Sequence, residues 1–131
     1  MIGLDTNILV RYIVEDDPKQ TKLSRHVIEK QLNPKKPGFI NQIVLCELVW
    51  VFESIYKIPR NDIAATLQRV LETNAFVVER ADLAWRALEQ YRGNQDFADV
   101  LIALTNTAYK CDYTITFDQG AARRKSMRLL D

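Results

Sequence analysis

Four acidic residues lie far apart in the chain, at positions where a carboxylate is difficult to explain as ordinary surface. They are Asp5, Glu47, Asp99 and Asp118. Asp5 ends a short apolar run at the start of the sequence, and Glu47 interrupts a long apolar stretch. A charge in apolar surroundings is costly unless it is paired or binds a metal. If the four carboxylates converge in space, they form a site for a divalent cation.

A carboxylate cluster without His or Cys suits a hard cation such as Mg²⁺ or Mn²⁺. These ions keep several waters and complete their coordination with phosphate oxygens of a substrate. Two such ions held close together can activate a water and stabilise the leaving oxygen of a phosphodiester. The residue types therefore indicate phosphodiester hydrolysis, and they leave open whether one ion or two would bind.

Each acid also has a purely structural explanation. Asp5 and Asp118 could cap the helices that follow them, because Asp is a preferred N-cap residue. Asp96 and Asp99 are three residues apart, at the N-cap and N3 positions of one helix, where the helix dipole favours negative charge. Glu47 fits a structural role least well, although a lone acid in an apolar helix usually finds a hydrogen-bond partner.

Strands and helices alternate along the chain and must position these acids. Short strands that alternate with helices indicate a parallel α/β sheet with helices on both faces. In such sheets ligands bind beyond the carboxyl ends of the strands, which is where Asp5 and Asp118 fall. The expected strands are 2–4, 39–40, 76–78, 113–116 and 127–130. Two helices are expected to begin at Thr6 and at Pro18, and a third to span 42–56 and to end before Pro59. A fourth is expected to begin at Asn61 or Asp62, and two more to span 81–92 and 97–110.

Length and composition predict one domain in a reducing, cytoplasmic setting. At 131 residues, with 47% hydrophobic and 27% charged residues, the chain has the profile of a soluble globular domain. A net charge of +1 does not by itself mark a nucleic-acid binder, but a balanced total can hide acids in a cleft with bases at its rim. Cys46 and Cys111 follow no metal-binding spacing and are expected to be buried thiols. The start lacks the basic region of a signal peptide, and no apolar run reaches the ~20 residues of a membrane-spanning helix.

The segments around the acids resemble the motifs of PIN-domain ribonucleases, in order and at similar separations. The resemblance covers essentially the whole chain, and four motifs in order are much more specific than any one of them. The compact size is similar to that of VapC toxins from toxin–antitoxin pairs. The matching segments are Ile-Gly-Leu-Asp-Thr-Asn-Ile-Leu-Val at 2–10, Glu47 in its apolar helix, Asp-Phe-Ala-Asp-Val-Leu-Ile-Ala at 96–103 and Thr-Ile-Thr-Phe-Asp at 114–118.

The resemblance implies a fold, a reaction and roles for individual residues. The implied fold is a three-layer α/β/α sandwich around a mostly parallel five-stranded sheet, commonly in a homodimer. The implied reaction is Mg²⁺- or Mn²⁺-dependent cleavage of RNA with water as nucleophile. The four acids would hold the metal, and Asp96 would help to hold a second metal or its water. Thr6, Asn7 and Thr116 would support the site.

Basic and apolar residues suggest partners. Arg123, Arg124 and Lys125 follow Asp118 closely and could contact RNA phosphates, or they could form a solvated basic segment. Arg11 could contact RNA or the acidic end of an antitoxin. An apolar surplus could serve a dimer interface or a groove for an antitoxin helix, although core packing is the default for each member. Its members are Leu45, Trp50, Phe52, Ile55 and Tyr56.

The leading hypothesis is a metal-dependent endoribonuclease, the toxin of a VapBC-type pair that inhibits translation and is neutralised by a VapB-type antitoxin. A PIN nuclease of RNA processing or turnover, without an antitoxin, is the nearest alternative. An inactive PIN scaffold that only binds a partner is another, which the intact acidic set opposes. A nucleotide-binding or phospho-signalling module predicts a Gly-rich phosphate loop, and none of the four glycines lies in such a motif.

Overall fold

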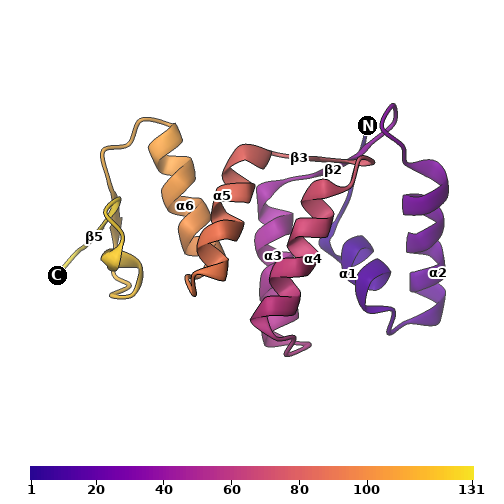
Figure 1. The fold of residues 1–131 in the computed structure, drawn as a ribbon, viewed down its shortest axis with the longest axis horizontal. Coiled ribbons are helices and arrows are strands. Elements are labelled where there is room, and N and C mark those ends of the chain that lie inside the picture. The colour runs from indigo at the N-terminus through magenta and orange to yellow at the C-terminus, as the bar shows by residue number, and fades with distance from the viewer. The chain divides into compact units, whose positions relative to one another are not determined.

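The computed structural model describes all residues from Met1 to Asp131 and divides into two compact units, Met1–Ala81 and Asp82–Asp131 (Figure 1). The first unit contains, in chain order, β1 (Ile2–Gly3), α1 (Thr6–Val14), α2 (Pro18–His26), η1 (Val27–Gln31), β2 (Gly38–Ile40), α3 (Gln42–Ser54), α4 (Arg60–Glu72) and β3 (Phe76–Val78). Helix α5 (Ala81–Arg92) begins at the boundary, and the second unit continues with α6 (Phe97–Ala108), β4 (Thr114–Thr116), η2 (Ala121–Arg123) and β5 (Met127–Leu129).

The sheet of the first unit has the order β1-β2-β3, and both of its strand pairs are parallel. Parallel neighbours require a long crossover connection, which helices usually provide. Helices α1 and α2 connect β1 to β2, and α3 and α4 connect β2 to β3. Asp5 lies two residues after β1 and Asn41 directly after β2, so polar residues follow the carboxyl ends of two adjacent strands.

Helix α3 forms the centre of the first unit's core. The Asn41 side chain caps it by accepting a 2.9 Å hydrogen bond from the backbone N–H of Val44. One face of the helix is buried, and the helix contacts α1 and α4. The opposite face carries Glu47 and Trp50, which are exposed. The buried residues are Val44, Leu45, Leu48, Val49 and Phe52.

The second unit holds a two-stranded parallel sheet, in which Thr114 is in register with Met127. The connection between β4 and β5 contains the single 3₁₀ turn η2. At the turn between α5 and α6, the rings of Tyr91 and Phe97 meet edge to face, with centroids 6.1 Å apart and planes at 85°. Both rings are buried, and Phe97 is the first residue of α6, next to the two acids Asp96 and Asp99.

The expected α/β class, with parallel strands and intervening helices, is confirmed, and all five expected strands form. They pair as a three-stranded and a two-stranded sheet. Helix α4 starts at Arg60, so the expected start at Asn61 or Asp62 was wrong. Its N-cap is Pro59, which provides no side-chain cap but whose carbonyl accepts hydrogen bonds from the backbone N–H groups of Asp62 and Ile63.

Two further observations concern the cysteines and the character of the helices. Cys111 is exposed and Cys46 is half-buried, and neither forms a disulfide, so the prediction of two buried thiols was wrong. Cys111 lies in the short loop between α6 and β4, and its neighbours Lys110 and Asp112 are exposed as well. None of the helices has the length and apolar character needed to cross a membrane.

Candidate metal centre

Asp5 caps helix α1. Its backbone is extended, with φ −81° and ψ 158°, as is typical of an N-cap residue. Its Oδ1 accepts a 2.9 Å hydrogen bond from the backbone N–H of Thr6. The structural explanation of Asp5 as a helix cap is therefore confirmed. The side chain is exposed, and Oδ2 accepts no hydrogen bond, so one oxygen stays available to a cation.

Thr6 also binds the second acid of the first unit. Its side chain is buried, with 6% of the residue exposed, and its hydroxyl donates a 2.8 Å hydrogen bond to Oε1 of Glu47. This contact joins α1 to α3 across 41 positions of sequence. Glu47 is exposed on this helix, so its charge meets solvent, and the hydrogen bond from Thr6 fixes one of its oxygens. Asp5 and Glu47 are both hydrogen-bonded to one residue.

Two acids of the second unit meet at the start of α6. Asp96 is the N-cap, and its Oδ2 accepts a 2.9 Å hydrogen bond from the backbone N–H of Asp99. Asp99 is half-buried and its carboxylate accepts no hydrogen bond. Burial raises the pKa of Asp99, and the negative charges of Asp96 and Asp118 raise it further, while Arg124 opposes the shift. A bound cation would favour the charged form of this carboxylate.

Asp118 is held in a tight turn after β4. Its Oδ1 accepts hydrogen bonds from the backbone N–H groups of Gly120, at 2.8 Å, and Ala121, at 3.1 Å. The hydroxyl oxygen of Thr116 accepts a 3.0 Å hydrogen bond from the backbone N–H of Asp118. A Cβ at position 120 would lie 3.2 Å from Oδ1 of Asp118, so glycine allows the close turn.

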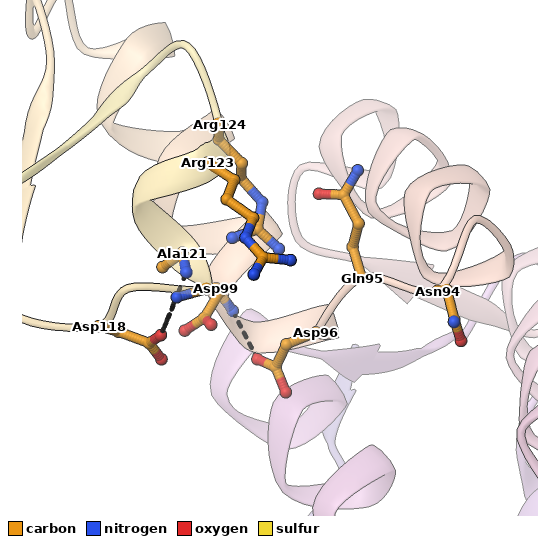
Figure 2. A pocket seen from close by; sticks show the side chains of 9 residues that line it. Asn94, Gln95, Asp96, Asp99, Asp118, Ala121, Arg123 and Arg124 are labelled. Carbon is orange, nitrogen blue, oxygen red and sulfur yellow. Dashed lines mark hydrogen bonds between the residues drawn. The ribbon is translucent and has the colours of Figure 1, made fainter.

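Asp96, Asp99 and Asp118 line one pocket of about 490 Å³ in the second unit (Figure 2). Figure 2 shows the three carboxylates along one side and the guanidinium groups of two arginines along the other. Nε of Arg124 is buried and has no hydrogen-bond partner. The pocket thus offers oxygen donors for a cation beside positive groups for an anion. Its lining residues are Asn94, Gln95, Asp96, Asp99, Asp118, Gly120, Ala121, Arg123 and Arg124.

The sequence matches the PIN domain family over residues 2–126. The chain belongs to the PIN domain family. A comparison with curated proteins finds no match. Membership of this family supports the expected nuclease activity in general terms, because PIN domains are in general nucleases that use divalent metal ions and bind RNA.

The donor chemistry of this PIN protein fits a hard cation. Within the first unit the structure joins Asp5 to Glu47 through Thr6, and within the second it brings Asp96, Asp99 and Asp118 to one pocket. All five are carboxylates, the ligand type that Mg²⁺ and Mn²⁺ prefer. No group of three or more His, Cys, Asp or Glu side chains lies close enough in the structure to hold a metal ion by itself.

Other expected residues of the PIN protein lie apart from the acidic pocket. Asn7 is exposed and its side chain makes no hydrogen bond, so its supporting role stays a prediction. Arg11 bonds Gln20, at 2.7 Å, Asp16, at 2.8 Å, and the hydroxyl of Tyr56, at 3.2 Å. These contacts give Arg11 a structural role in joining α1 to α2 and to the end of α3. Lys125 lines a neighbouring groove instead.

Four pocket residues were not predicted from the sequence: Asn94, Gln95, Gly120 and Ala121. Gly120 supports Asp118 through its N–H, and the run Asp-Gln-Gly at 118–120 is a turn signal that could have identified it. Asn94 and Gln95 line the pocket from the turn before α6. Their composition indicates a turn, but no sequence pattern indicates that they face the acids.

Proposed function

We propose that this PIN protein is an Mg²⁺- or Mn²⁺-dependent endoribonuclease. The observation that carries the proposal is the pocket in which Asp96, Asp99 and Asp118 lie beside Arg123 and Arg124. Carboxylates without His or Cys suit a hard cation, and arginines suit the phosphate that such a cation would polarise. Membership of a family of nucleases gives independent support.

The proposed metal ligands are Asp5, Glu47, Asp99 and Asp118, for one ion or two, with Asp96 in a supporting role. This assignment requires the two units to act as one PIN domain over residues 1–131. The family match supports it because it runs from residue 2 to residue 126 and so includes residues of both units. Four of the acids already accept hydrogen bonds that orient them, and each keeps one oxygen without such a bond.

A divalent cation in this site would lower the pKa of a bound water and neutralise charge on the phosphate during hydrolysis. The protein's own groups would do the rest. Thr6 orients Glu47, and Thr116 and Gly120 orient Asp118. Arg123 and Arg124 hold the phosphodiester by charge-assisted hydrogen bonds. Hydrolysis forms one bond between phosphorus and the water oxygen and breaks one between phosphorus and a ribose oxygen, which takes up a proton.

The finer proposal is a VapC-type toxin that inhibits translation, forms a homodimer and is neutralised by a VapB-type antitoxin. Its support is the resemblance in length and motif order, together with apolar surface on the first unit. Trp50 and Ile55 are each 60% exposed and could contact a partner. Leu45 and Phe52, from the same expected apolar set, are buried and therefore serve the core.

The activity test compares four proteins on a labelled single-stranded RNA with Mn²⁺ or with EDTA. Wild type is expected to cleave only with the metal. Asp5→Asn and Asp99→Asn are expected to lose at least ~100-fold in rate, because each removes a charged ligand. Asp112→Asn is the matched control, since Asp112 is an exposed carboxylate outside the pocket. Full Mn²⁺-dependent cleavage by a folded Asp99→Asn protein would overturn the mechanism.

The toxin proposal has a separate test in cells. Brief expression of wild type is expected to arrest growth and to produce RNA fragments with defined ends, whereas Asp99→Asn is expected to do neither. Cleavage in vitro without growth arrest would favour the alternative of a PIN nuclease in RNA processing or turnover.

A further inference from the structure

A second groove adjoins the acidic pocket in the same unit. It has a volume of about 480 Å³, and Gln95 and Arg124 line both spaces. The groove lies among α5, α6 and the residues just before β5. Its lining residues are Arg86, Gln90, Gln95, Val100, Ala103, Leu104, Thr107, Arg124, Lys125 and Ser126.

The groove is positively charged, in contrast to the pocket beside it. Three cationic side chains line it, from Arg86, Arg124 and Lys125, and no carboxylate does. None of the three forms an ion pair with an acid in the structure. Arg124 faces the carboxylates of the adjoining pocket, whereas Arg86 and Lys125 lie outside that pocket and add a positive potential that attracts an anion. The charge of the groove therefore favours an anionic occupant.

The floor of the groove is apolar. Val100 and Ala103 of α6 are buried, and Leu104 beside them is half-buried. Thr107 and Ser126 supply hydroxyl groups at the edge. A volume of this size lies within the range of roughly 300–1,000 Å³ that small organic ligands occupy. Aliphatic side chains beside cations suit a nucleotide, whose ribose or base packs on carbon while its phosphate meets the cations.

We propose that this groove binds the nucleotide next to the cleaved phosphodiester of an RNA substrate. The inference rests on the proposed nuclease function, because Arg124 and Gln95 join the groove to the pocket in which that phosphodiester would lie. In this arrangement Arg124 lies between the phosphate at the cleaved bond and the next phosphate along the strand. Arg86 and Lys125 contact that next phosphate. Phosphate contacts of this kind set the register of the strand and read no base.

Binding is measured first, with the full chain and a labelled 12-nucleotide single-stranded RNA in EDTA, where no cleavage occurs. Arg86→Gln and Lys125→Gln are each expected to weaken binding about three- to tenfold and to reduce the slope of log affinity against log salt by about 0.7. Lys110→Asn is the matched control. It removes one positive charge from the same unit outside both spaces, and Asn tolerates the φ of 71° at this position. Unchanged affinity and slope in both groove variants would overturn the proposal.

Cleavage is measured second, with the RNA shortened one nucleotide at a time on each side of the cleaved bond. Arg86→Gln is expected to raise KM about three- to tenfold for the longer RNAs and to leave kcat unchanged. The defect is expected to disappear when the nucleotide that occupies the groove is removed. A KM equal to that of wild type for every length would overturn the subsite while leaving the nuclease intact. Absence of cleavage by wild type would instead refute the proposed function. An acidic peptide that binds wild type but not Arg86→Gln, together with RNA affinity that is unchanged in Arg86→Gln, would show that the groove serves a protein and would also overturn the proposal.

Discussion

The hydroxyl of Thr6 donates a 2.8 Å hydrogen bond to Oε1 of Glu47, while its backbone N–H donates one of 2.9 Å to Oδ1 of Asp5. One buried residue therefore orients two of the proposed metal ligands, which come from different helices. The side chain of Thr6 is as important to this arrangement as the acids themselves, because Glu47 has no other hydrogen-bond donor.

Replacement of Thr6 by Val should impair both stability and cleavage. Val keeps the shape of Thr but removes the donor to Glu47, so we expect the free energy of unfolding to fall by about 1 kcal/mol. Loss of the orientation of Glu47 should slow RNA cleavage roughly tenfold or more. Denaturant unfolding and single-turnover cleavage measure the two effects. Thr6→Ser keeps the hydroxyl and should recover most of the cleavage rate; equal rates for Val and Ser would contradict this role.

Substitutions of Asp96 should separate helix capping from metal binding. Asp96→Ala removes the cap of α6 and should destabilise the protein by about 1 kcal/mol. Asn is also a good N-cap, so Asp96→Asn should keep the stability of wild type. If Asp96 supports a metal, Asp96→Asn should still need more Mn²⁺ for half-maximal cleavage. An Asn variant with the wild-type metal dependence would leave Asp96 with the capping role alone.

The Arg11 network should make stability depend on pH through Asp16. Hydrogen bonds from the hydroxyl of Tyr56, at 2.7 Å, and from Arg11 hold the pKa of Asp16 below its ordinary value. A carboxyl whose pKa is lower in the folded state stabilises the protein above its ordinary pKa. That stabilisation disappears as the pH falls through the lowered value.

Asp16→Asn should therefore reduce the melting temperature slightly at neutral pH, since the group is exposed and screened by solvent. The difference between variant and wild type should vanish at pH values well below about 4. Thermal melts of both proteins from pH 7 to pH 2.5 provide the measurement. A difference that stays constant over this range would show that the charge of Asp16 does not contribute.

Metal binding should stabilise the protein through acids of both units. At a Mn²⁺ concentration a hundred times the dissociation constant, wild type should gain about 2.7 kcal/mol. Asp5→Asn and Asp99→Asn should each lose most of this gain, whereas Asp112→Asn should keep it. Melting temperatures with Mn²⁺ and with EDTA test the prediction without any need for RNA. Loss of the gain in only one of the two site variants would show that the acids do not share a cation.

Local patterns predicted the local features of this fold well. The spacing of Asp96 and Asp99, followed by an apolar run, predicted the N-cap that the structure contains, because capping depends only on neighbours in sequence. The order of alternating strand and helix segments predicted the parallel α/β class, because helices usually connect parallel strands. The start of α4 was missed because both Pro59 and the polar residues after it are plausible helix starters.

Contacts between distant parts of the chain could not be predicted in this way. Nothing in the sequence pairs Thr6 with Glu47, since 41 positions separate them and α2, η1 and β2 lie in between. Arg11 was expected to contact RNA or an antitoxin, and its hydrogen bonds with Gln20 of α2 and with Tyr56, just after α3, could not be predicted from its neighbours in sequence. Arg86 gave no signal at all, because an arginine on an amphipathic helix is ordinary until Lys125 and Arg124 are found beside it.

The hydrogen bonds from main chain and hydroxyl groups to the proposed ligands have an entropic consequence. A carboxylate that is already fixed in one rotamer spares the site about 0.5–1.5 kcal/mol of ordering cost when a ligand arrives. Asp96 and Asp118 obtain this advantage from the N–H groups at the first turns of α6 and η2. Fraying of those turns would therefore release the side chains and weaken cation affinity well before the second unit unfolds.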